Sequence, residues 1–167
     1  MRTLCLKAVL AAFFLSLSFL PGALACPAEA VQARPLPVIT PQALETLIQG
    51  LGKPLLVVYW ASWCGPCQMY RKETLSIIAE RYGDDLAMVG ISVDTDSSKA
   101  DAYVRDNDMP FLPLQASPSL YALRKGSSIP ATYLYDKDGN EVKQFTGAVR
   151  LKRVDYFVRK ALGHLPK

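Results

Sequence analysis

The chain has 167 residues, of which 50% are hydrophobic and 20% are charged. This balance excludes intrinsic disorder, and the length is typical of a single domain. The formal net charge is +4, but Arg2 and Lys7 are the only charged residues among the first 25. The rest of the chain therefore carries only a slight basic excess, so we expect no nucleic acid as a partner.

Residues 1–25 have the features of a secretory signal peptide. An apolar run over residues 8–20 follows the basic residues, and Ala23 and Ala25 provide the small-x-small pattern that signal peptidase requires. The run is too short to span a bilayer as a helix. We therefore expect export to the periplasm, where disulfide bonds persist.

Cys26 directly follows the expected cleavage site. A cysteine at this position accepts lipid in bacterial lipoproteins, although Ala23 stands where such sites usually carry Leu. Two outcomes stay open: plain cleavage, which we favour, and an anchor through a lipidated Cys26. Residues 26–37 are rich in Ala and Pro and read as an extended linker, which leaves 38–167 as the folded domain.

The first half of the domain alternates between helix and strand patterns. Thr40-Pro41 predicts the start of a short helix that ends at Gly50. The continuous apolar run over 55–60 predicts a strand buried on both faces. A helix to about Tyr82 and a second buried strand over 86–93 follow it.

The second half combines short helices with a hairpin. Helices are expected from Asp94–Ser98 to about Asn107 and from Ser117 to about Gly126. The segment 109–114 contains two prolines, so it is not expected to form an ordinary central strand. Strands over 131–135 and 141–146 are joined by a hairpin turn, and an amphipathic helix closes the chain. This order predicts an α/β fold with a mixed sheet and helices on both faces.

The chemistry is concentrated at Cys64 and Cys67, which lie between a buried strand and a helix. A C-x-x-C motif beside a βαβ pattern is typical of redox-active dithiols. Cys64 would lie at the helix N-terminus, where free N–H groups and the helix dipole favour a thiolate. Cys64 is therefore the expected nucleophile. Cys67, one turn later and more buried, is the cysteine expected to resolve the mixed disulfide.

Two other interpretations of this cysteine pair are weaker. Zinc needs about four ligands, whereas the chain has no second C-x-x-C and its one histidine, His164, lies near the C-terminus. An inert structural disulfide would close too small a loop to restrict the unfolded chain much. We therefore expect no metal and no organic cofactor.

The sequence resembles the thioredoxin superfamily, in the secreted branch typified by the TlpA and ResA thiol-disulfide proteins. Three segments carry the resemblance over residues 38–162: Trp60-Ala61-Ser62-Trp63-Cys64-Gly65-Pro66-Cys67, Gly90-Ile91-Ser92-Val93-Asp94, and Ser128-Ile129-Pro130-Ala131-Thr132 with the Asp-Gly hairpin after it. The resemblance implies a thioredoxin fold with a helical insert before the strand that follows a cis-proline.

The resemblance also implies roles for residues around the motif. Pro130 would form a cis bond and lie against the sulfurs, and the backbone of Ile129 would pair with an extended substrate segment. Trp63 is expected on the exposed rim beside Cys64, and Trp60 in the core. These implications make Trp63, Ile129 and Pro130 the candidate substrate-binding residues.

The chain departs from the family pattern where a proton acceptor is expected. Thioredoxins commonly bury an Asp six residues before the first cysteine, and Val58 stands there. ResA-like proteins often carry Glu three residues after the second cysteine, and Tyr70 stands there. Glu73 reads as a solvated helix carboxylate. The proton acceptor for Cys67 is thus left open by the sequence.

The predicted function is thiol-disulfide exchange with protein disulfides outside the cytoplasm, as a reductant. We expect a monomer that receives electrons from a membrane partner. The alternatives are a thiol peroxidase of the related redoxin group and a non-catalytic binding module that has kept the fold.

Overall fold

The computed structural model describes residues 34–165, so the expected signal peptide and Cys26 lie outside the described residues. In chain order the elements are β1 (Val38–Ile39), α1 (Pro41–Gly50), β2 (Leu55–Trp60), α2 (Gly65–Tyr70), the π-helical segment η1 (Arg71–Leu75), α3 (Ser76–Tyr82), β3 (Ala87–Ser92), α4 (Ser97–Asp106), β4 (Leu112–Ala116), α5 (Pro118–Arg124), β5 (Ala131–Tyr135), β6 (Glu141–Thr146) and α6 (Leu151–Ala161). Within this part of the chain no helix combines the length and the apolar character that crossing a membrane requires.

Six strands form one mixed sheet in the order β1-β4-β3-β2-β5-β6. The pairs β1–β4, β4–β3 and β3–β2 are parallel, whereas the pairs β2–β5 and β5–β6 are antiparallel. Helical crossovers produce the parallel pairs and a tight turn produces the last antiparallel pair. The expected α/β fold with a mixed sheet is confirmed.

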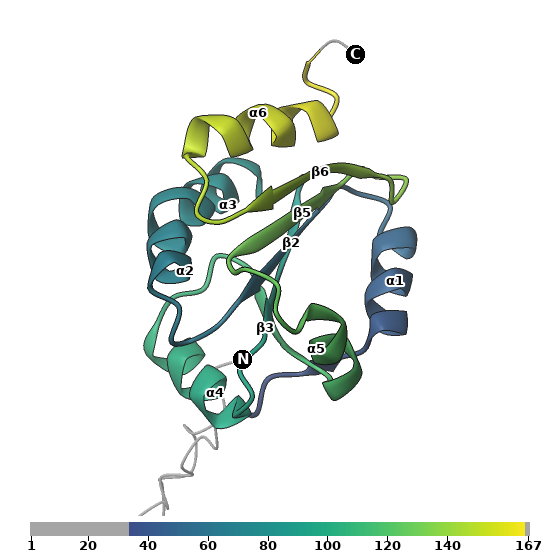
Figure 1. Ribbon diagram of the computed structural model, residues 1–167. Coiled ribbons are helices and arrows are strands. Elements are labelled where there is room, and N and C mark those ends of the chain that lie inside the picture. The colour runs from purple at the N-terminus through teal and green to yellow at the C-terminus, as the bar shows by residue number, and fades with distance from the viewer. Residues whose placement is uncertain (1–33, 166–167) are drawn as a thin grey trace, which may run out of the picture. The chain divides into compact units, whose positions relative to one another are not determined.

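The central strand β2 is buried on both faces, as its apolar run predicted. Its even-numbered residues (Leu56, Val58, Trp60) pack into one core with residues of α2, α3, α4 and α6. Its odd-numbered residues (Leu55, Val57, Tyr59) pack into the other with residues of α1 and α5. Figure 1 shows α1 and α5 on one side of the sheet, with α2 and α3 on the other. Successive side chains of a strand point to opposite faces, so one strand supplies both cores.

The expectation that segment 109–114 avoids a central strand was wrong. Leu112–Ala116 forms β4, second from the sheet edge, with Pro113 opposite Gly90 of β3. The N–H of Gln115 donates to the Pro37 carbonyl, on the β1 side of β4. The backbone nitrogen of Pro113, two residues earlier, faces the same side. Because β1 reaches only Gln115 and Ala116, the missing N–H of Pro113 falls where no strand pairs with it.

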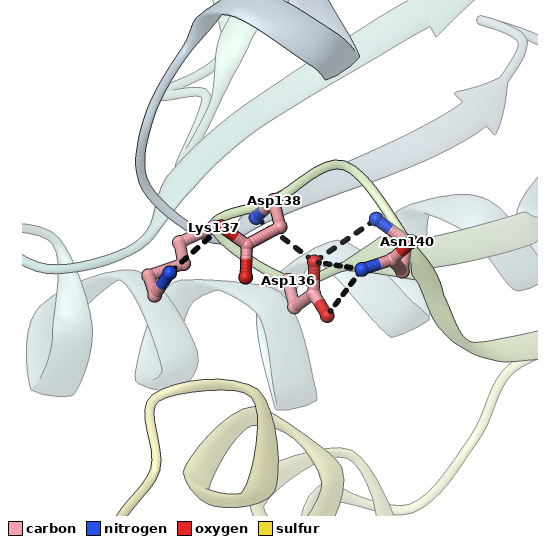
Figure 2. Close-up of polar contacts among 4 residues, drawn as sticks. All are labelled: Asp136, Lys137, Asp138 and Asn140. Atoms are coloured by element: carbon pink, nitrogen blue, oxygen red, sulfur yellow. Dashed lines mark hydrogen bonds and ion pairs between the residues drawn. The ribbon is translucent and has the colours of Figure 1, made fainter.

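The β5–β6 hairpin is held by one aspartate at its turn. Asp136 Oδ1 accepts hydrogen bonds from the backbone N–H groups of Asp138 and Asn140, each at 2.9 Å, and its carboxylate also receives the Asn140 side-chain amide (Figure 2). Gly139 has φ +80°, a conformation that side chains disfavour. The turn therefore starts the β5–β6 pairing, in which Ala131, the residue after Pro130, lies opposite Thr146.

The helix after the cysteine motif runs to Tyr82 as expected, but it contains a π-helical segment that the sequence did not reveal. In η1 the backbone N–H of Ser76 bonds to the carbonyl of Arg71, and the Ser76 hydroxyl donates to the same oxygen at 3.0 Å. Such wide turns inside α-helices are frequent at functional sites. This one begins at Arg71, four residues after Cys67.

Candidate active site

Cys64 and Cys67 are joined by a disulfide bond just beyond the end of β2, with a Cα–Cα distance of 5.2 Å. Both residues are buried, whereas Gly65 and Pro66 between them are exposed. The structure therefore has the motif in its oxidised state, and the two-residue spacing brings the sulfurs together within the first turn of α2.

Cys64 caps the N-terminus of α2. Its Sγ accepts a hydrogen bond from the backbone N–H of Cys67 at 3.2 Å, and Pro66 occupies the first turn. The first N–H groups of a helix have no partner within the helix, so a side-chain acceptor at this position satisfies one of them. After reduction the same N–H group would favour a Cys64 thiolate over the thiol.

The loop that presents Cys64 is clamped by a buried aspartate, Asp94, for which the sequence predicted only a possible helix cap. Asp94 accepts hydrogen bonds from the backbone N–H of Ser62 at 2.9 Å and from its hydroxyl at 2.8 Å. The Ser92 hydroxyl bonds to the same carboxylate, and Gln115 donates to the Asp94 carbonyl. The available signal was that Asp94 follows a buried parallel strand, whose carboxyl end lies at the same sheet edge as that of β2.

The two tryptophans lie where the sequence predicted. Trp63 is 69% exposed beside Cys64, while Trp60 is buried between Tyr103 and Phe111. Trp63 borders a pocket of about 140 Å³ that Ile129 and residues of α5 also line. A large exposed aromatic ring beside a pocket is typical of a surface that binds another molecule.

Pro130 is buried, and the Ile129–Pro130 peptide bond is cis, as the resemblance implied. Pro130 and Cys67 line the same small pocket. The tertiary structure thus brings together residues 63–67 and 129–130 from opposite ends of the domain.

Val58, Tyr70 and Glu73, at or near the positions where the family carries an acidic residue, provide no buried carboxylate near Cys67. Val58 is buried and apolar, and Glu73 is exposed on the helix. Tyr70 is buried and receives a hydrogen bond from the Thr132 hydroxyl at 3.4 Å. Burial raises the pKa of Tyr70 to about 12, an effect that this hydrogen bond only partly offsets. Tyr70 is therefore neutral and holds its proton near neutral pH.

Arg71 is the second site residue that sequence reasoning missed. It is 7% exposed, and it lines the same pocket as Cys67 and Pro130. Its spacing of four residues from Cys67 places both side chains on one helix face, which was the only signal in the sequence.

Among residues 34–165 no group of three or more His, Cys, Asp or Glu side chains is arranged to hold a metal ion.

Comparison with known proteins agrees with this geometry. The model of the thioredoxin-like domain family matches residues 41–162. A thioredoxin from Mycolicibacterium smegmatis is 36% identical over 110 residues, which cover 66% of this chain and 80% of that protein. The thiol-disulfide oxidoreductase ResA from Oceanobacillus iheyensis is 25% identical over 108 residues, covering 64% of this chain and 56% of that protein.

Solved structures share the fold. A secreted Mycobacterium tuberculosis disulfide oxidoreductase, described as homologous to E. coli DsbE, superposes with a TM-score of 0.53 at 22% identity. The match covers 68% of this chain and 83% of that one. The resemblance to the thioredoxin superfamily is confirmed.

Proposed function

Because the chain belongs to the thioredoxin-like family of thiol-disulfide oxidoreductases, we propose that it acts outside the cytoplasm as a reductant of protein disulfides. The observation that carries the proposal is the Cys64–Cys67 disulfide at the start of α2, beside an exposed Trp63. The signal-peptide features of residues 1–25 support the location. The Gly65-Pro66 dipeptide, as in thioredoxins, supports the direction.

In this proposal Cys64 is the nucleophile and Cys67 the resolving cysteine. The Cys64 thiolate attacks one sulfur of a substrate disulfide, that disulfide breaks, and the released substrate sulfur takes a proton. Cys67 then loses its proton and attacks Cys64 Sγ. The mixed disulfide breaks as the Cys64–Cys67 bond forms, and the substrate leaves as a dithiol. Two electrons have passed from the protein to its substrate.

Trp63, Ile129 and Pro130 are proposed to hold the substrate beside Cys64. Trp63 supplies an exposed aromatic surface, and Ile129 lies in the pocket that Trp63 borders. The backbone of Ile129 precedes β5, where an extended segment can add to it by main-chain hydrogen bonds. Such contacts would favour protein disulfides over small-molecule disulfides.

The outer parts of the chain are proposed to deliver and place this domain. Residues 1–25 would be removed, residues 26–37 would act as a linker, and residues 38–167 would form a monomeric domain. A membrane partner would return electrons to the disulfide. Cys26 would be a free thiol, part of a disulfide bridge or the site of a lipid anchor, and the mass of the mature N-terminus from native cells distinguishes these forms.

Trapping of mixed disulfides tests the cysteine roles. Cys67→Ser should accumulate mixed disulfides with exported proteins, since nothing resolves the product, and Cys64→Ser should accumulate none. Equal trapping by the two variants would contradict the order. The direction is tested by alkylating thiols in intact cells: a Cys64–Cys67 pair found mainly reduced supports a reductant, and a pair found mainly oxidised contradicts it. Insulin reduction without peroxide consumption would exclude the peroxidase alternative.

A further inference from the structure

Arg71 carries a buried positive charge without a carboxylate partner. Its two terminal amino groups donate to the Asp108 carbonyl and to the Asn107 side-chain oxygen, the latter at 3.1 Å. The guanidinium also lies 5.8 Å from the centre of the Tyr103 ring. Among the residues that the structure describes, no carboxylate oxygen lies within 4.0 Å of it. A buried charge without a counter-charge is costly, so this arrangement needs an explanation.

A third nitrogen of Arg71, Nε, has no partner for its N–H group in the described part of the chain. The Nε–H of Arg71 and the indole N–H of Trp60 are both buried and have no hydrogen-bond partner within residues 34–165. Both side chains line a pocket of about 10 Å³ together with Cys67, Val58 and Pro130. A space of this size suits one water molecule. Two unpaired donors on side chains that line this space call for an acceptor, which a water oxygen or a thiolate provides.

We propose that Arg71 is the counter-charge of the Cys67 thiolate, acting through one water held by Arg71 and Trp60. The water would accept hydrogen bonds from the two donors and donate one to Cys67 Sγ. Arg71 and the water would take over the role of the buried aspartate that thioredoxins commonly have. In this chain Val58 occupies the sequence position of that aspartate. The inference rests on the proposed role of Cys67 as the resolving cysteine, and it makes Arg71 a positioning residue.

The chemistry differs from that of a general base. A carboxylate accepts the proton of Cys67, whereas a cation lowers the cost of forming the thiolate and the proton passes through the water to solvent. The thiolate then attacks Cys64 Sγ, and the departing substrate sulfur takes up a proton from solvent. A nearby opposite charge favours the ionised form of an acid, so the cation would raise the thiolate fraction of Cys67 near neutral pH.

Few other ionisable groups face this pocket. Within residues 34–165, Tyr103 of α4 is the only other titratable residue that lines it. The uncharged lining residues include Val58, Trp60, Ala61, Met109, Phe111 and Pro130. Nearby on other elements, Tyr70 bonds to Thr132, and Asp94 bonds to Ser62 and Ser92. Among the residues that the structure describes, the charge of Arg71 is therefore the one that a Cys67 thiolate would meet in the pocket.

Stopped-flow reaction of the reduced full-length protein with dithiobis-nitrobenzoate separates the two steps. All variants carry Cys5→Ser and Cys26→Ser, so that only the motif cysteines react. Attack by Cys64 releases the first nitrothiobenzoate at a rate proportional to reagent, and attack by Cys67 releases the second at a rate independent of reagent. Absence of the second phase would contradict the cysteine roles themselves, whereas its pH profile tests Arg71.

Arg71→Met should slow the second phase by about ten-fold near neutral pH, with recovery at alkaline pH where Cys67 ionises unaided. Arg71→Lys keeps a cation on the same helix face and should retain most of the rate. Trp60→Phe should slow the second phase to a smaller extent, because one donor to the water is lost. The first phase should not change in any of the three, and circular dichroism checks the fold of each variant.

Two matched controls separate charge from structure. Lys72→Met removes an exposed cation from the neighbouring position and should leave both phases unchanged. Asn107→Ala removes a contact that anchors Arg71 but keeps its charge, so the pH profile should stay in place. The proposal is overturned if Arg71→Met leaves the second phase unaltered, slows it equally at every pH, or behaves like Asn107→Ala.

Discussion

Gly90 in β3 leaves room for Phe111, and replacing it by alanine tests how tightly the sheet is packed beside the active site. A Cβ at position 90 would come within 3.0 Å of three atoms of the Phe111 ring. The ring is 7% exposed and packs against Trp60 with their centres 6.2 Å apart, so it has little room to retreat. Overpacking of this kind costs about 1–3 kcal/mol.

Urea and thermal unfolding of the oxidised protein measure the effect of Gly90→Ala. A loss of this size lowers Tm by about 2–4 °C for each kcal/mol in a chain of this length. Gly50→Ala is the matched control: its Cβ would meet nothing within 4 Å at the end of α1, so stability should be unchanged or slightly higher. Phe111→Leu should reduce the penalty of Gly90→Ala, because the two changes act on one contact. No loss in Gly90→Ala, or a loss of the same size in the Phe111→Leu background, would refute the reasoning.

Two further predictions concern Tyr70 and Trp63. Because the pKa of Tyr70 is about 12 in the folded protein and near 10 when unfolded, its contribution to stability is fully present below pH 10 and is lost as the pH rises toward 12. Tyr70→Phe should remove about 3 kcal/mol of that alkaline loss, measured by urea unfolding across this range, and an unchanged pH dependence would contradict it. Trp63→Ala should lower kcat/KM for a protein disulfide by about ten-fold while leaving unfolding and reaction with dithiobis-nitrobenzoate unaffected, since the ring is exposed. An equal loss with both substrates would place Trp63 in the chemical step instead.

The local chemistry of the chain was sufficient to predict most of its elements. Three helices begin with a side-chain cap, provided by Thr40, Asp96 and Ser117. Thr40 and Ser117 were the predicted caps, and Asp96 lies within the segment 94–98 where a cap was predicted. The apolar run of β2 and the Asp-Gly turn predicted a doubly buried strand and a hairpin. These features depend on neighbours along the chain, which the sequence displays directly.

The sequence by itself also identified the redox motif, because two cysteines at this spacing before a helix meet within one turn. It could not predict the strand pairing of Leu112–Ala116, since whether Pro113 disrupts a ladder depends on how far the two-residue β1 extends. The position of Asp94 after a buried strand and the spacing of Arg71 from Cys67 did not show that Asp94 clamps the loop before Cys64, or that Arg71 lines the pocket beside Cys67. The first of these contacts joins residues 32 positions apart, and the second arises at a π-helical turn. Only the tertiary structure, which decides which side chains are withdrawn from water together, could reveal them.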